Sequence, residues 1–137
     1  MTNDVKAALN AKTSIEAMLP YRPLLESALA YAGGTHTFED VVEAVNEGRM
    51  HFWPAKQSAL VTELIVYPRA KALHVFLAAG DLDEIKGFDE SLQNLARLLD
   101  AKYISLSGRR GWQKALSDIG FSLSHITMVK EVGDVDG

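Results

Sequence analysis

The sequence predicts an α+β domain with a mixed, mostly antiparallel central sheet flanked by helices. Three observations carry this prediction. Apolar residues recur at helical spacing in two early segments, three segments rich in Val, Leu and Ile then follow one another closely, and helical and extended patterns alternate in the last third of the chain. Strands that follow so closely indicate a hairpin, and the later alternation indicates a mixed sheet covered by helices.

Two helices are expected before the sheet. Pro23 suits the first turn of the earlier helix, and Gly33-Gly34 is expected to end it. Thr37 is predicted to cap the later helix, which Asn46-Glu47-Gly48 closes. The Ala-rich residues 1–19 are expected to form a helical arm in front of the domain.

The first three strands are expected over residues 50–53, 58–67 and 70–79. Pro54 is expected to stop the first of them because proline cannot donate a backbone hydrogen bond. The second and third are close enough in the chain to form an antiparallel hairpin. Residues 80–87, which follow the third, are interpreted as a polar connection.

The C-terminal third is expected to hold an amphipathic helix over residues 88–99, a strand over 103–106, a helix over 109–119 and one bent or two short strands over 121–132. Gly120 is expected to end the second of these helices with a left-handed cap. The domain is therefore predicted to span residues 20–132, followed by a frayed acidic tail over 133–137.

The composition restricts the class of protein. The chain has 137 residues, which suits one domain, and it contains no cysteine, which excludes disulfides, thiolate zinc sites and cysteine catalysis. A net charge of -4 disfavours nucleic-acid binding. We expect no signal peptide, no membrane span and a cytoplasmic location. The four histidines lack metal-ligand spacing, so no metal site is predicted.

The run Gly108-Arg109-Arg110-Gly111-Trp112 to Ile119-Gly120-Phe121 resembles the last helix and Leu-Gly-Phe ending of the GNAT superfamily of N-acetyltransferases. The order of elements over residues 20–132 resembles that superfamily as well. The succession of Trp-Pro, Leu-Ala-Ala-Gly-Asp, Gly-Arg-Arg-Gly-Trp and Gly-Phe also resembles small acetyltransferase-like proteins of bacteriophages and prophages.

This resemblance implies an acetyl-coenzyme A site, but two features of the chain depart from the superfamily's pattern. Members bind the diphosphate on a glycine-rich loop after the central strand, where this chain places Asp81, Asp83 and Glu84, whose charges repel phosphate. Many members also use a tyrosine of the last helix as an acid, and that position is Leu116. The sequence therefore predicts no cofactor, with acetyl-coenzyme A as the alternative.

Two sets of residues are candidates for chemistry. Glu63 and His74, on neighbouring predicted strands, are candidate general bases if the chain is an enzyme. The alternative is that Glu63 is exposed or ion-paired and that His74 packs on Phe76. Gly108, Arg109, Arg110 and Gly111 form a candidate anion site at a helix start, because free N–H groups and guanidinium groups bind anions; the alternative is a loop with solvated arginines.

The main functional prediction is a non-catalytic protein that acts in protein interaction or assembly, in the host cytoplasm or in a phage virion. Its expected partner is another protein or a second copy of itself, not nucleic acid or a membrane. The alternative is an acetyl-coenzyme A-dependent N-acyltransferase with an atypical donor loop. A further alternative is a small inhibitor of a host enzyme, which would present the acidic residues 81–90 to a basic partner.

Overall fold

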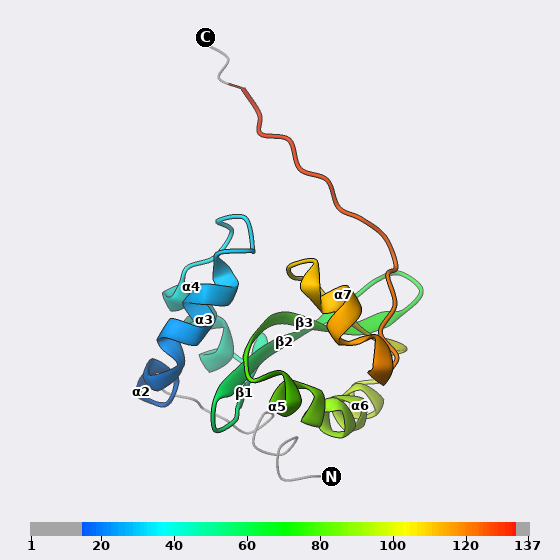
Figure 1. Cartoon of the computed structure of the whole chain (residues 1–137), viewed down its shortest axis with the longest axis horizontal. Coiled ribbons are helices and arrows are strands. Elements are labelled where there is room, and N and C mark those ends of the chain that lie inside the picture. The colour runs from blue at the N-terminus through cyan, green and yellow to red at the C-terminus, as the bar shows by residue number, and fades with distance from the viewer. Residues whose placement is uncertain (1–14, 134–137) are drawn as a thin grey trace.

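The computed structural model describes residues 15–133, in which helices lie on both faces of one sheet (Figure 1). The expected helical arm is therefore described only from Ile15, and the acidic tail only at Gly133. Within the described residues, three short helical elements come first and a fourth helix follows: α2 (Ile15–Met18), η1 (Leu19–Tyr21), α3 (Arg22–Leu29) and α4 (Phe38–Asn46).

The later elements alternate between strand and helix. They are β1 (Met50–Pro54), β2 (Ser58–Val66), β3 (Lys71–Gly80), α5 (Leu82–Gly87), α6 (Asp89–Leu98), β4 (Tyr103–Leu106), α7 (Gly111–Ala115) and η2 (Ser117–Ile119). The predicted α+β class is confirmed, and so are the four strands that precede Gly108.

The sheet has the order β1-β2-β3-β4. β1 pairs antiparallel with β2 and β2 antiparallel with β3, whereas β3 and β4 run parallel. This is the mixed, mostly antiparallel sheet that the sequence predicts. Pro54 is the last residue of β1 rather than the residue after it, and an edge strand tolerates proline because one side of its backbone has no partner.

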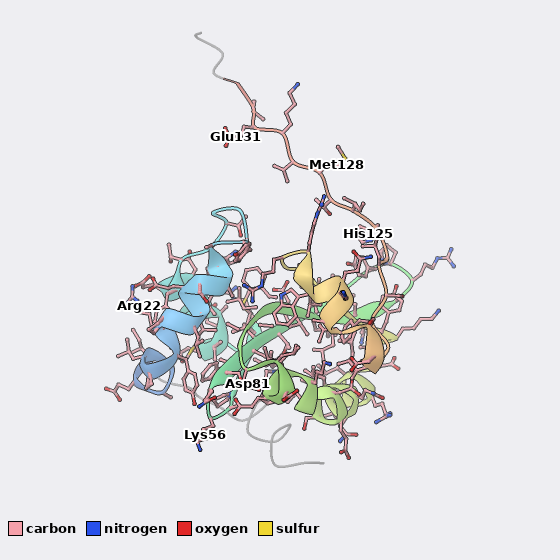
Figure 2. All side chains as sticks on the ribbon, viewed as in Figure 1. Arg22, Lys56, Asp81, His125, Met128 and Glu131 are labelled. Carbon is pink, nitrogen blue, oxygen red and sulfur yellow. The ribbon has the colours of Figure 1, made fainter. Side chains whose placement is uncertain are left out.

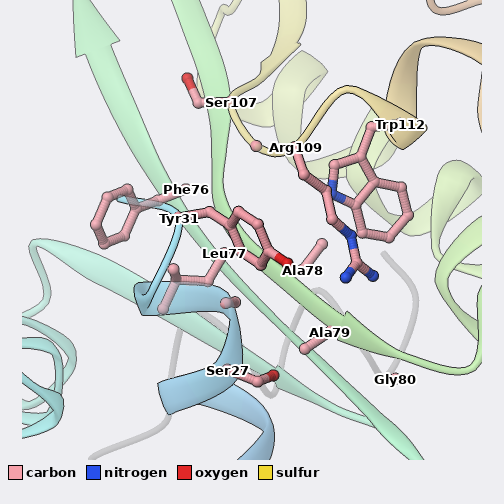
Figure 3. Close-up of a pocket in the computed structure, with 12 residues that line it drawn as sticks. Ser27, Tyr31, Phe76, Leu77, Ala78, Ala79, Gly80, Ser107, Arg109 and Trp112 are labelled. Carbon is pink, nitrogen blue, oxygen red and sulfur yellow. The ribbon is translucent and has the colours of Figure 1, made fainter. Parts of the chain in front are cut away.

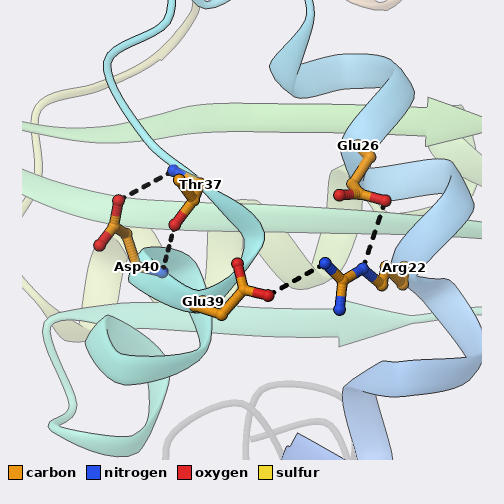
Figure 4. Close-up of polar contacts among 5 residues, drawn as sticks. All are labelled: Arg22, Glu26, Thr37, Glu39 and Asp40. Atoms are coloured by element: carbon orange, nitrogen blue, oxygen red, sulfur yellow. Dashed lines mark hydrogen bonds and ion pairs between the residues drawn. The ribbon is translucent and has the colours of Figure 1, made fainter.

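Helices α2, α3 and α4 cover one face of the sheet. Met18, Leu25 and Phe38 are at most 1% exposed and pack on apolar side chains of β1 and β2. Thr37 caps α4 as predicted: its hydroxyl accepts from the Asp40 N–H and its own N–H donates to the Asp40 carboxylate (Figure 4). The cap therefore sets where α4 begins, and its apolar stripe sets which face it covers.

Helices α5 and α6 cover the other face. Leu92 and Leu95 of α6 pack with Leu73 and Val75 of β3, and all four are at most 5% exposed. Trp53 of β1 completes this second cluster and meets Phe88 edge to face, with ring centroids 6.0 Å apart. Burial on both faces explains why β3 is apolar at every position from Ala72 to Ala79 except His74.

Several boundaries differ from the prediction. Residues 80–87 are not a plain connection, because Asp81 caps the six-residue helix α5. The last predicted helix is split into α7 and η2, although Gly120 does end it in the left-handed region with φ of 98°. The earlier helix ends at Leu29, before Gly33-Gly34.

The largest correction concerns residues 121–132, which form no strand in the structure. They leave the body and run away from it in an extended path (Figure 1). A strand exists only where a neighbouring strand accepts its backbone hydrogen bonds, and an apolar pattern by itself does not supply that neighbour.

Among the described residues, no helix is both long enough and apolar enough to cross a bilayer.

Candidate functional site

A one-residue bulge divides β3. Val61 of β2 faces Leu77 and the next residue, Thr62, faces Val75, so Phe76 is an extra residue with no partner on β2. The extra residue reverses the alternation of side chains along the strand. Val75 therefore packs under α5 and α6, whereas Leu77 packs under α2, α3 and α4.

Pairing between β3 and β4 stops at the bulge. Val75 faces Leu106 in the last pair of the parallel ladder, and a Ser107 N–H to Val75 C=O bond of 3.3 Å follows. Within the described chain, no strand pairs with residues 76–80 of β3 on the side away from β2. The two strands thus separate into a split that exposes backbone N–H and C=O groups of β3.

A pocket lies in this split (Figure 3). Residues 76–80 of β3 form its floor, Ser27 and Tyr31 of the α3 region form one wall, and Ser107 to Arg109 with Trp112 form the other. The cavity volume is about 60 Å³. A groove this small, with a backbone floor, suits a narrow, extended group better than a ring system.

Arg109 lies across the mouth of this pocket. Its guanidinium carbon is 5.6 Å from the ring centre of Tyr31 and 5.6 Å from that of Trp112, so the cation bridges the two walls (Figure 3). Gly108 lets this happen, because a Cβ at that position would lie 2.6 Å from Cδ1 of Trp112. The predicted anion site is therefore represented at the pocket by Gly108 and Arg109.

The other two residues of that candidate site lie elsewhere. Arg110 and Gly111 do not line the pocket, and both are exposed. α7 has only five residues and its N-cap, Arg110, makes no side-chain capping bond. The structure therefore moves the anion-binding hypothesis from the helix start to the side chain of Arg109.

The two candidate bases are brought together. Glu63 of β2 and His74 of β3 are direct cross-strand partners, and Ser105 of β4 faces His74 on its other side. Nδ1 of His74 lies 2.8 Å from Oγ of Ser105, within hydrogen-bond distance. All three side chains are half-buried. His74 comes two residues before Phe76, and Ser105 comes two residues before Ser107, and both Phe76 and Ser107 line the pocket.

The environment keeps His74 neutral near pH 7. Partial burial lowers the pKa of the His74 imidazole, and the negative charge of Glu63 opposes that shift without reversing it. A neutral imidazole has a free lone pair and can accept a proton. The ring that packs on Phe76 is that of His36, tilted by 57° with ring centroids 4.7 Å apart, whereas the His74 ring contacts Ser105.

The start of α5 does not fit a diphosphate. The Asp81 carboxylate accepts from the Glu84 N–H at 3.0 Å. The Glu84 carboxylate in turn accepts from the Gln57 N–H at 2.8 Å and from the hydroxyl of Ser58. The backbone donor that would hold a phosphate is thus taken by the chain's own carboxylate, and a phosphate would meet two negative charges. The Asp81 carboxylate instead caps α5, and the Glu84 carboxylate fastens α5 to the start of β2.

The last helix carries a leucine, Leu116, at the position for which the resemblance to the superfamily implies an acid. Leu116 is 2% exposed and lies beside Ile119 and Phe121 in a small apolar pocket. Its role is packing. In the described residues, no group of three or more His, Cys, Asp or Glu side chains is arranged to hold a metal ion.

The sequence alone missed Phe76 and Ser105 as parts of the site. A bulge leaves no reliable mark in a strand whose residues are nearly all apolar, since the alternation that would reveal it is absent. Ser105 is an ordinary serine in a predicted strand, and only the pairing of β3 with β4 places it against His74.

Solved structures share this architecture, although no family model and no curated protein matches the sequence. The chain is similar to a probable acetyltransferase, with a TM-score of 0.67 and 11% identity over 89% of this chain and 96% of that one. It is also similar to an aminoglycoside acetyltransferase from an uncultured soil metagenomic sample, solved with sisomicin, with a TM-score of 0.60 and 9% identity over 88% and 93%.

A Trypanosoma brucei acetyltransferase is similar at a TM-score of 0.58 and 10% identity, over 84% of this chain and 92% of that one. The chain therefore has the α+β fold of GNAT-type acetyltransferases, as its sequence predicts. Identities of this size concern the fold, and the chemistry has to be argued from the chain's own residues.

Proposed function

We propose that the protein transfers an acyl group from a thioester donor to an amine, with the donor's thioester end in the split between β3 and β4. One observation carries this proposal. The bulge at Phe76 opens a groove with a backbone floor, and His74, whose imidazole is neutral near pH 7, lies two residues before Phe76 on the same strand. An acyl acceptor and an acyl donor would meet where these two features adjoin.

The residues supply the two functions that acyl transfer requires. Backbone N–H groups on the open side of β3 would donate to the thioester carbonyl oxygen, which gains negative charge as the amine attacks. His74 would accept the proton that the amine nitrogen loses as it bonds to the acyl carbon. The carbon–sulfur bond then breaks, and the departing thiolate takes a proton from solvent.

Ser105 and Glu63 would act on His74 rather than on the substrate. The contact of Ser105 Oγ with Nδ1 fixes the orientation of the imidazole ring, which leaves Nε2 for the substrate. The charge of Glu63 would stabilise the imidazolium form after proton transfer, because the two residues face each other across the strands.

The donor of this proposal is a thioester held mainly through its acyl end. The residues at the split suit a narrow pantetheine-like arm, and Arg109 offers one cation at its mouth. The capped start of α5 gives no place for the diphosphate of coenzyme A. We therefore expect S-acetyl-pantetheine, which has no phosphate, to bind within about tenfold of acetyl-coenzyme A, a difference of about 1.4 kcal/mol.

Thiol release tests the proposal cleanly, because the chain has no cysteine to react with a thiol-detecting dye. Each donor is offered with a panel of polyamines and amino sugars. We expect turnover with at least one amine, and a 100-fold or greater loss in His74→Asn, which keeps a polar group near Ser105 but removes the base. His125→Asn, in the exposed C-terminal segment, is the matched control and should retain full activity.

Failure to bind either donor at millimolar concentration in calorimetry would overturn the proposal. Equal activity of His74→Asn and wild type would remove His74 from it.

A second candidate is the non-catalytic role in interaction or assembly. The observation that favours it is the occupation of the α5 start by Asp81 and Glu84, which replaces a ligand with internal contacts. Absence of donor binding, together with an unchanged fold, would select this role. A place in a phage virion and inhibition of a host enzyme stay predictions from the sequence.

A further inference from the structure

The groove between β3 and β4 ends next to two carboxylates. Its floor stops at Gly80, and the next residue, Asp81, caps the start of α5 (Figure 2). The carboxylates of Asp81 and Glu84 both accept hydrogen bonds from backbone N–H groups of the chain itself. A donor whose arm continues into a diphosphate meets negative charge at this end, whereas an arm that ends in a single phosphate can leave the groove past Arg109.

The wall of the groove that leads into α7 is cationic. Residues 103–117 contain three basic residues and no acidic residue, although the whole chain has a net charge of -4: Arg109, Arg110 and Lys114. All three side chains are exposed, and none of them has an ion-pair partner in the described part of the chain. The opposite wall belongs to residues 27–35, which carry no Asp, Glu, Lys or Arg. The two walls therefore present uncompensated positive charge around the mouth of the groove.

The three cations differ in what they can reach. Arg109 lines the groove and lies across its mouth, whereas Arg110 and Lys114 do not line it. Arg110 has helical backbone angles at the start of α7, and Lys114 follows it four positions later, so both lie on one face of the helix. A small donor inside the groove reaches Arg109. The other two cations are placed to contact a ligand that extends beyond the groove and carries negative charge on its own surface.

A pantetheine arm carries acyl groups in two chemical settings. In coenzyme A the arm continues through a diphosphate to a nucleotide, whereas on a carrier protein a single phosphate joins the arm to a serine side chain. The arm of a carrier protein needs no diphosphate site, and its phosphate can approach Arg109. An acidic carrier surface would then place carboxylates opposite Arg110 and Lys114. The charges around the groove thus favour the carrier protein over the nucleotide.

We propose that the acyl donor is a small acidic carrier protein that inserts its phosphopantetheine arm into the groove and docks on Arg110 and Lys114. This inference rests on the acyl-transfer function proposed above and names the donor of that reaction. The amine nitrogen bonds to the acyl carbon, and the carbon–sulfur bond breaks with its electron pair on sulfur. One proton passes overall from the amine to sulfur, so the carrier keeps its arm as a free thiol. Docking raises the effective concentration of the thioester at the groove.

Four acetyl donors test this assignment with one amine that the protein turns over. They are S-acetyl-pantetheine, its 4′-phosphate, acetyl-coenzyme A and an acidic, cysteine-free acyl carrier protein that bears the acetylated arm. Thiol release gives kcat/KM for each donor. We expect the value for the carrier to exceed that for the free 4′-phosphate about 100-fold or more, because docking and arm insertion act together. Raising NaCl from about 50 to about 500 mM should lower the carrier's value about tenfold and leave that of S-acetyl-pantetheine within about twofold.

Charge reversal separates docking from chemistry. Arg110→Glu and Lys114→Glu are combined in one chain, and because neither residue lines the groove, turnover of S-acetyl-pantetheine should stay within about twofold of wild type. With the carrier as donor, KM should rise about tenfold or more at unchanged kcat, since the docking surface is lost. Arg69→Glu makes the same kind of charge change in the hairpin between β2 and β3, at the opposite end of β3 from Gly80, and is the matched control.

Calorimetry with the carrier in its free-thiol form measures docking without turnover. Binding that weakens about tenfold in the double variant, but not in Arg69→Glu, supports the assignment. A carrier that reacts no better than the free 4′-phosphate, or equal effects of the double variant and Arg69→Glu, would overturn it and leave the acyl-transfer function in place. Absence of turnover with every donor would instead overturn the acyl-transfer function, and with it the donor role of any carrier that binds.

Discussion

The two halves of β3 differ in what lies beside them. The closed half, residues 71–75, pairs with β2 on one side and β4 on the other, whereas the open half, residues 76–80, pairs with β2 only. A single extra residue, Phe76, separates them. The comparison shows how one strand can hold a fold together in its first half and leave one side of its backbone unpaired in its second.

The largest expected effect is on the closed half. Leu73 is 0% exposed between β2, β4 and α6, so Leu73→Ala should lower the free energy of unfolding by about 3 kcal/mol through lost burial and the cavity left behind. Urea unfolding followed by circular dichroism measures it. Leu98→Ala, at a site 54% exposed, should change stability by less than about 0.5 kcal/mol. If the two variants lost the same free energy of unfolding, burial of Leu73 in the closed half would not be a main source of stability.

The end of the open half is expected to be nearly as sensitive, but for a backbone reason. Gly80 has φ of 115°, and an added Cβ would overlap the Gln57 carbonyl and lie 2.5 Å from Cα of Ser58. Gly80→Ala should therefore cost roughly 2 kcal/mol in urea unfolding. Gly111→Ala is the control, because a Cβ there meets nothing within 4 Å. If both variants have the same free energy of unfolding, the close approach of Gly80 to Gln57 and Ser58 does not require a glycine.

A third effect is the pH dependence that His74 gives to the closed half. Burial lowers the pKa of His74 in the folded state, so below its unfolded pKa of about 6.5 the unfolded chain binds more protons. This contribution to stability is complete above that pH and is lost as pH falls. The urea midpoint should be lower at pH 5.5 than at pH 7.5.

His51 adds to the same trend, since burial lowers its pKa too. His74→Asn should reduce the difference between the two midpoints, while His125→Asn, in the exposed C-terminal segment, should leave it unchanged. A difference that His74→Asn does not alter would place the pH dependence elsewhere.

The smallest effect on stability is expected at the mouth of the open half. Arg109 contacts two rings at a partly exposed site, so Arg109→Ala should change the free energy of unfolding by less than about 1 kcal/mol. Binding of an anionic thioester donor, measured by calorimetry, should weaken about tenfold through loss of the cation. Arg110→Ala, at a residue that does not line the pocket, should bind as wild type does. Equal binding by all three proteins would remove Arg109 from the site.

Half of the candidate site could be predicted from the sequence. Glu63 and His74 were recognised because ionisable residues stand out within apolar strands, and the structure makes them cross-strand partners. The candidate anion site, Gly108 to Gly111, includes the arginine that lines the groove, Arg109, but a linear pattern does not tell which of the two arginines faces it. Ser105 could not be recognised, since its meaning comes only from the strand beside it.

The sequence by itself determined the order of α4, β1, β2 and β3, the Thr37 cap of α4 and the left-handed end at Gly120. These depend on interactions among residues close together in the chain, which local spacing and residue type reveal. The tertiary structure alone decided the bulge at Phe76, the split it opens and the absence of a strand over residues 121–132. These depend on which strand lies beside which, and pairing across long separations leaves no local mark in the sequence.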